Sequence, residues 1–571
     1  MLAVIAGAAW LFWPSPSTSG PSVTARAKAT APVDPNALSA KLISSEDLPP
    51  EGTRSLFDHL IAQNESLPYP FEKLVALVRR QDPDARPPVA LMVPFGRSLL
   101  KAQADFVHPR VLVAADFEGA DGASLGLRAR GALFLGFVEN AGEIEVISYN
   151  EAAGRYEFQL VQDYRPDGKP RIVYAKRAVC TTCHQGAAPI FPQRPWNETN
   201  GQPEIKQKIV EARGEAPYLG VPALNELQVP ERFDQLTDVA NFIPPTQRVW
   251  IDGCADGESG AQCRRLLLKL ALRYAWNPGA FDAAGADAEK LRALQAAHWP
   301  AGGIAVPESD LRNRDPLAER HTVSGRVRET LAALLPHRKQ QAEPKSNEDL
   351  EAFERLPRLP AELDPLTPRP PKRVLTAQDI DGVFGLASMF TAADVRLLAQ
   401  AAKQDWPRVE AAVDALPAAF LQPAPFSRVR SVQALLGGGL AAKRAPVPAY
   451  CCLDTAEMSP PIALGEPALA LALASPLKPF EDYCFACHRG NPSKRLNFMG
   501  GKTEAEVLEH VQAKPEIRDA LDWPRYRGTA KENKLMPPAD SAQRARLEQA
   551  LAQDPKLLET MRAVVPGLFD F

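Results

Sequence analysis

The chain has 571 residues, a net charge of −3 and no block of like charges, so we expect no nucleic-acid partner and no attraction to an anionic membrane surface. Hydrophobic residues make up 45% of the chain, enough for packed cores in roughly three or four domains. Proline is abundant, with 55 residues, and predicts many fixed loops and extended crossings between elements.

The amino-terminal stretch MLAVIAGAAWLFW is apolar, but it is shorter than the ~20 residues that a helix needs to span a bilayer. It also lacks the basic flank of a complete signal peptide. We interpret it as the remainder of a signal or membrane anchor, or as a short apolar core of a signal. The residues that follow, as far as 36, are rich in Pro, Ser, Thr and Ala and predict a flexible tether.

Helical periodicity predicts helices between 37 and 64 and over 71–80, where His59 is interpreted as a surface or packing residue. Six short apolar and β-branched runs follow between 87 and 178, separated by Asp-Gly, Ala-Gly and Pro-Asp-Gly turns. This pattern predicts an antiparallel meander. The alternation over 155–164 predicts one buried face and one face in contact with water.

The last predicted strand leads directly into a Cys-x-x-Cys-His motif formed by Cys180, Cys183 and His184. This pattern is the signature of covalent haem attachment, in which two thiols form thioethers and the imidazole binds the iron. A zinc or redox Cys-x-x-Cys is the alternative. The apolar and aromatic loop over 185–200 is interpreted equally as contact to a porphyrin face or as a cover over the sheet end.

From 205 to about 340 the sequence predicts helices separated by Pro-Pro and Gly turns. Cys254 and Cys263 bracket a Gly-rich loop and predict a local disulfide, with two buried thiols as the alternative. The adjacent Cys451 and Cys452 predict either a vicinal disulfide or separate thiols. This cysteine usage favours an oxidising compartment.

Three histidines of the middle region are candidates for the second axial position at the first motif: His298, His321 and His337. For each of them a surface or capping role is the favoured interpretation. A Pro-rich linker follows, and then more helices, one of them beginning at Thr391.

A second Cys-x-x-Cys-His motif, formed by Cys484, Cys487 and His488, lies near the carboxyl end, and Met536 stands in a later Met-Pro-Pro turn. A neutral thioether sulfur opposite a histidine raises the reduction potential of a haem iron. The alternative for Met536 is a buried core methionine, as expected of Met499 and Met561. Both motifs together predict two covalently attached haem c groups, with His184, His488 and Met536 as iron ligands.

Residues from about 476 onward resemble a class I cytochrome c domain in the attachment motif, the Met-Pro-Pro turn and a closing amphipathic helix, with an Asp-Pro step at 554–555 that predicts a break. The resemblance implies an all-α fold and His488/Met536 ligation. A weaker similarity to dihaem cytochrome c peroxidases rests on the two motifs alone, because the wide spacing and the β-rich region depart from that family.

The predicted fold class is therefore multidomain α+β, with an antiparallel β-rich amino-terminal region, a helical middle and an all-α carboxy-terminal domain. The predicted divisions are a signal or anchor remnant with linker, helices with the meander and the first motif, a helical region, a Pro-rich linker with helices, and the cytochrome-like domain: 1–36, 37–204, 205–350, 351–475 and 476–571.

The favoured function is that of an exported dihaem c-type cytochrome that moves electrons between partners such as a small redox protein or a quinone-linked donor or acceptor. The expected location is the periplasm, with or without a tether to the inner membrane. One alternative is a peroxidase-like haem oxidoreductase with an open first haem fed by the second. The other is a redox subunit of a membrane-associated complex.

Overall fold

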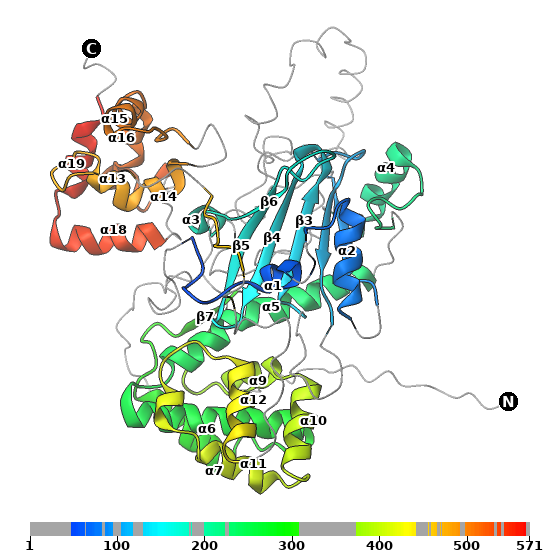
Figure 1. The fold of residues 1–571 in the computed structure, drawn as a ribbon. Coiled ribbons are helices and arrows are strands. Elements are labelled where there is room, and N and C mark those ends of the chain that lie inside the picture. The colour runs from blue at the N-terminus through cyan, green and yellow to red at the C-terminus, as the bar shows by residue number, and fades with distance from the viewer. Residues whose placement is uncertain are drawn as a thin grey trace, which may run out of the picture.

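The structure is a computed structural model. It describes residues 47–62, 64, 66–82, 86–94, 104–117, 130–181, 184, 199–222, 228–307, 373–440, 455, 458–464, 469, 471–490, 497–529, 534–537 and 542–566. It has the predicted α+β layout, with a sheet in its amino-terminal part, helices beside the sheet and a separate carboxy-terminal group of helices (Figure 1).

Six antiparallel strands form one sheet in the order of the chain, which confirms the predicted meander. Each strand falls on one of the β-branched and aromatic runs that predicted it, because such side chains pack well on a pleated, buried surface. The strands are β1 Val89–Val93, β2 Arg110–Ala114, β3 Leu133–Val138, β4 Glu143–Asn150, β5 Arg155–Gln162 and β6 Arg171–Tyr174. Since β6 forms one edge of this sheet, the chain leaves the sheet from that edge toward the first motif.

One face of the sheet is covered by the two helices that precede it, α1 Leu56–Ala62 and α2 Phe71–Arg80. The Phe71 ring of α2 stacks on Phe137 of β3, with 4.8 Å between ring centroids. The backbone N–H of Phe57 donates to the Ser148 hydroxyl of β4. His59 of α1 is buried, so it is a packing residue.

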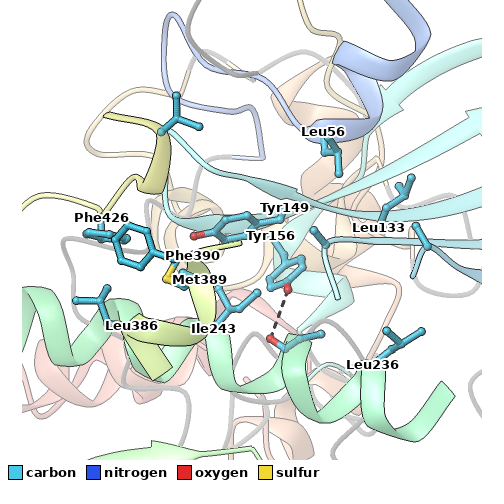
Figure 2. Packing of buried hydrophobic residues seen from close by; sticks show 14 of the residues in the cluster. Leu56, Leu133, Tyr149, Tyr156, Leu236, Ile243, Leu386, Met389, Phe390 and Phe426 are labelled. Atoms are coloured by element: carbon cyan, nitrogen blue, oxygen red, sulfur yellow. Dashed lines mark hydrogen bonds between the residues drawn. The ribbon is translucent and has the colours of Figure 1, made fainter. Parts of the chain in front are cut away.

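The opposite face is covered by α5, Gln228–Asp252, which continues through Pro244 and Pro245. The predicted helix break at this Pro-Pro pair is therefore wrong. Proline removes the N–H that would bond the carbonyl four residues earlier. For Pro244 that carbonyl belongs to Ala240. The Tyr156 hydroxyl of β5 lies 3.4 Å from it, toward α5 in Figure 2, but the same hydroxyl has a nearer acceptor in the carbonyl of Gly131, at 2.5 Å. The helix therefore continues through the Pro-Pro pair while it packs on the sheet, without a full replacement for the lost hydrogen bond.

Strand β5 also departs from its prediction, because its first five residues, from Arg155 to Gln159, are all buried. The face predicted to contact water carries Arg155, Glu157 and Gln159, and α1 with the residues before it covers them. Arg155 donates to Glu157 and to Leu48 O, and Gln159 bonds to Ser55 and to Asp58 of α1. These protein groups take the place of water. The alternation of polar and apolar residues correctly predicted which side chains share a face of β5, but it wrongly predicted that the polar face is exposed to water.

The helices beyond the sheet pack on the far side of α5 and share one buried apolar cluster with it, from Leu56 to Leu440. In Figure 2, Tyr149 of the sheet approaches Phe390 and Phe426 of this helical layer. The layer consists of α6 Gly257–Trp276, α7 Ala286–Ala296, α9 Asp381–Met389, α10 Ala392–Ala401, α11 Trp406–Asp414 and α12 Arg428–Gly437, while α4 Pro203–Arg213 lies beside the sheet.

Three local details of this layer bear on the predictions. Thr391 caps α10 in a reciprocal capping box with Asp394, as the sequence predicts for a helix start. Cys254, just after α5, and Cys263 of α6 form the predicted disulfide. Sequence reasoning missed a two-stranded pair, β7 Ile304–Val306 and β8 Arg373–Leu375, because its partners are far apart in the chain.

The carboxy-terminal helices enclose an apolar cluster of their own, from Leu477 to Val565. They are α13 Lys478–Tyr483, α14 Phe485–His488, α15 Glu504–Gln512, α16 Glu516–Ala520, α17 Trp523–Tyr526, α18 Ala542–Gln553 and α19 Leu557–Val564. The closing helix is divided at the Asp-Pro step, as predicted. Met499 and Met561 are buried in this cluster, as expected of core methionines.

Within the described ranges, no single helix has both the length and the apolar composition to cross a bilayer. Helices α9 and α10, which meet at 84°, pass the same criteria as a bent pair. Their buried residues belong to the main apolar cluster.

The end of α5 depends on Arg264 of α6, a fully buried arginine that donates to the carbonyls of Trp250, Ile251, Cys254 and Ala255 at 2.8 to 3.1 Å. The carbonyls of Trp250 and Ile251 lie in the last turn of α5, where a helix offers its carbonyls no partner, and those of Cys254 and Ala255 follow the helix. We expect Arg264→Leu to lower the free energy of unfolding by at least about 3 kcal/mol, because several buried acceptors lose their donor at once. Chemical denaturation measures this change.

The matched control is Arg265→Leu in the next position of α6. Arg265 is half-buried and donates to one carbonyl, that of Leu416. Its loss should cost about 1 kcal/mol. Equal costs for the two substitutions would contradict the assigned role of Arg264.

Candidate haem-attachment sites

The first motif begins where the sheet edge turns into a short helix, α3, Arg177–Cys180. The helical turn continues past α3, since the N–H of Thr181 donates to Arg177 O and that of His184 donates to Cys180 O at 2.9 Å. Residues four apart on a helix lie on one face. Cys180 and His184 therefore share a side, while Cys183 falls outside the described residues. The His184 ring packs against Phe158 of β5, with 5.4 Å between centroids.

The first turn of α3 is fixed to the sheet by Arg177. Its guanidinium donates to Glu157 Oε2 at 2.6 Å and to Tyr156 O at 2.9 Å, and its backbone N–H donates to Asp47 Oδ1. Arg155 donates to the other oxygen of Glu157 at 2.8 Å. The carboxylate of Glu157, fully buried, thus lies between two arginines. We call Arg155, Glu157 and Arg177 the buried charge cluster.

A second polar group continues from this cluster along the same face of the sheet. Asp58 of α1 accepts from the Tyr174 hydroxyl and, at 2.7 Å, from Gln159, which in turn accepts from Ser55. Burial raises the pKa of Asp58 above its usual value, although the bonds from Tyr174 and Gln159 oppose the shift. Burial also raises the pKa of Asp47. These bonds tie the edge strand β6 to α1 immediately before the first motif.

The second motif forms a similar helical turn in the carboxy-terminal group. The N–H groups of Cys487 and His488 both donate to Cys484 O, at 3.1 and 3.0 Å, so the two sulfurs and the imidazole lie on one side of α14. The His488 ring lies 4.4 Å from that of Phe498. Burial raises the pKa of Cys484 to about 12 and that of Cys487 to about 11. A redox Cys-x-x-Cys site needs the opposite shift.

Met536 lies in a loop that backbone hydrogen bonds fix on both sides. Its N–H donates to Ala520 O at 2.9 Å, and its carbonyl accepts from Trp523 Nε1 at 3.1 Å. Arg544 of α18 donates to Pro537 O and places its guanidinium 3.5 Å from the Trp523 ring centroid. The Met536 side chain is half-buried, and it does not belong to the buried set that contains Met499 and Met561.

The structure brings the two motifs together, although more than half of the chain separates them. Helix α14 contacts α3, and Figure 1 shows the two side by side between the sheet and the carboxy-terminal group. The charges of Lys176 and Asp47, from the region of the first motif, act on the pKa of Cys487 in the second. The pairing of β6 with the segment before α13 adds a further link. Tyr174 N–H donates to Ile462 O, and Leu464 N–H donates to Tyr174 O, both at 2.7 Å.

Of the three histidines considered as further ligands at the first motif, His298 is exposed just beyond the end of α7. Helix α7 lies in the helical layer, well away from α3 in Figure 1. His298 therefore has the surface role that was favoured. His321 and His337, the loop 185–198 and the pair Cys451–Cys452 lie outside the described residues.

The residues present fit covalently attached haem. In both turns the first cysteine and the histidine share one helical side, and Cys180, Cys484 and Cys487 carry thiols that can form thioethers. Each histidine also has an apolar ring beside it, Phe158 or Phe498. Within the part of the chain that the structure describes, no group of three or more His, Cys, Asp or Glu side chains is arranged to hold a metal ion.

Comparison with family models, curated proteins and solved structures found no match for this chain.

Sequence reasoning found both motifs and missed their contact, because no local pattern connects segments so far apart in the chain. It also missed the buried charge cluster. A signal for the cluster was present in Arg155 and Glu157, opposite charges two residues apart on one face of a predicted strand, where cross-strand and same-face partners interact.

Proposed function

We propose that this protein is a dihaem c-type cytochrome that transfers electrons. Cys180 and Cys183 would hold one haem with His184 as axial ligand, and Cys484 and Cys487 would hold the other with His488. Each thiol adds its S–H across a haem vinyl group, so that sulfur bonds one carbon and hydrogen the other. When bound, the two groups supply one-electron redox chemistry.

The observation that supports this function best is the contact between α3 and α14. Electron transfer between two centres requires that they lie close together, and a pair of unrelated cysteine motifs has no reason to meet across two separately packed groups of helices and strands. The chain places the histidine-bearing turns of both motifs at one junction, and the link from Tyr174 to residues 462–464 keeps the junction closed.

Met536 is the residue that we propose would bind the iron of the second haem together with His488. Its side chain is more exposed than those of the two core methionines of the same helical group. Its backbone is fixed by bonds with Ala520 and Trp523, and that of the next residue, Pro537, by a bond from Arg544. Such fixing suits a ligand, because a thioether bond to iron is weak and benefits from a loop that is already positioned.

The carboxy-terminal helices, α13 to α19, are the part for which we propose the all-α class I cytochrome c fold. They enclose a core of their own around the second motif and Met536. The proposal includes export to the periplasm, an oxidising compartment in which the Cys254–Cys263 disulfide would persist and in which covalent haem attachment would be completed. Its partners would be a small redox protein or a quinone-linked donor or acceptor.

Haem content tests the proposal most simply. We expect the denatured, exported full chain to have the mass of the polypeptide plus two haem groups, since thioethers survive denaturation. The double substitution Cys484→Ala/Cys487→Ala should retain one group. The matched control, Cys254→Ala/Cys263→Ala, removes a cysteine pair outside the motifs and should retain two. A wild-type chain with one group or none would refute the dihaem function.

Spectroscopy of ferric protein tests the assignment of Met536. We expect Met536→Ala to lose the weak sulfur-to-iron charge-transfer band of a His/Met haem, because the sulfur is removed. Met561→Ala serves as the control. It should keep the band while lowering the free energy of unfolding by about 2–5 kcal/mol, the usual cost of truncating a buried methionine. A band that survives in Met536→Ala would assign the ligand elsewhere.

A further inference from the structure

We infer that Arg177 raises the reduction potential of the haem attached at the first motif, acting as a fixed positive charge one aromatic ring away from His184. This inference rests on the proposed function. It concerns a residue outside the attachment motif, whose effect on the iron would be electrostatic and would not involve a bond to it.

The placement of Arg177 is the first part of the argument. Its guanidinium carbon lies 5.5 Å from the centroid of Phe158, and the same ring packs on His184 at 5.4 Å between centroids. The arginine and the proposed iron ligand thus contact one ring on β5. Arg177 is buried, so water screens its charge little at this distance.

The end of β6 explains why an arginine can reach this position. Strand β6 pairs with β5 over Gln159–Gln162, the next backbone bond runs from Ala175 N–H to Phe158 O at 2.8 Å, and the carbonyl of Tyr156 lies beyond both. Arg177 donates to this carbonyl and to Glu157. The side chain therefore completes the hydrogen bonds of the sheet edge, and in doing so it is held beside Phe158.

The two other members of the buried charge cluster lie on the opposite side of β5. Phe158 and Glu157 are neighbours on a strand, so their side chains point to opposite faces, and Arg155 shares the face of Glu157. The guanidinium of Arg177 reaches both faces around the open edge. Of the three charges, that of Arg177 is the one placed beside the ring that contacts His184.

The sign of the effect follows from charge alone. Oxidation of a haem iron adds one positive charge, and a nearby buried cation makes that addition less favourable. Arg177 therefore favours the reduced state and raises the potential, whereas Glu157 opposes it from the far face. Removal of each charge should shift the potential in opposite directions, which a loss of packing would not do.

Spectroelectrochemical titration of the full-length dihaem protein tests the inference. The wave of the first haem is identified as the one retained in Cys484→Ala/Cys487→Ala. We expect Arg177→Gln to move this wave to lower potential and Glu157→Gln to move it to higher potential. In both variants the wave of the second haem should move less than that of the first.

Two further variants separate charge from structure. Arg177→Lys keeps the positive charge but loses the planar, multi-bond geometry, so it should restore most of the potential lost in Arg177→Gln even if stability stays low. Arg155→Gln removes a positive charge from the same cluster on the far face, and it should lower the potential less than Arg177→Gln does.

The outcomes are distinguishable. If the mass of the wild-type preparation shows fewer than two haems, the proposed function fails and the inference falls with it. If two haems are present and Arg177→Gln and Glu157→Gln shift the first wave in the same direction or leave it in place, the inference alone is overturned. The same holds if Arg177→Lys behaves like Arg177→Gln. If Arg177→Gln does not fold, an unchanged or lower potential in Glu157→Gln is sufficient to overturn it.

Discussion

The contact between α3 and α14 is the constraint on which the proposed function depends. One of these short helices leaves the edge of the sheet, and the other belongs to a group of helices with its own core. Neither is long enough to be stable alone, because a single helical turn forms too few hydrogen bonds to offset the unfavourable free energy of helix nucleation. Each therefore needs the structure behind it, and the proposed haem pair would lie where the two supports meet.

The sheet supplies the more elaborate of these supports. Its polar face carries Arg155, Glu157 and Gln159 in a buried layer, where water would ordinarily be expected. Burying a charge costs several kcal/mol unless it is paired and fully hydrogen-bonded. The cluster meets most of that requirement through two arginines on one carboxylate and through the bond from Arg177 to the carbonyl of Tyr156, although Arg177 Nε has no hydrogen-bond partner among the described residues. The same bonds fix the first turn of α3, so the arrangement that satisfies the buried charges also orients the first motif.

Local patterns predicted much of this architecture. Six β-branched runs with turn signals gave the order of the meander, Thr391 marked a helix start, and the Asp-Pro step marked a break, because each of these features acts over a few residues. Features that depend on distant partners were predicted wrongly or not at all. Pro244 lies inside a helix because the sheet packs against it, and the polar face of β5 is dry because α1 covers it. For the candidate sites, composition and spacing identified the cysteines and histidines, but the meeting of the two motifs is a property of the complete fold.

The close spacing of the two proposed haems is the central claim, and circular dichroism in the Soret region tests it most directly. Two closely spaced porphyrins in a fixed relative orientation couple their transitions, so we expect the wild-type protein to show a two-signed band. The variants Cys180→Ala/Cys183→Ala and Cys484→Ala/Cys487→Ala, each with one haem, should lack this band. A wild-type spectrum equal to the sum of the two single-haem spectra would contradict the adjacency of the sites.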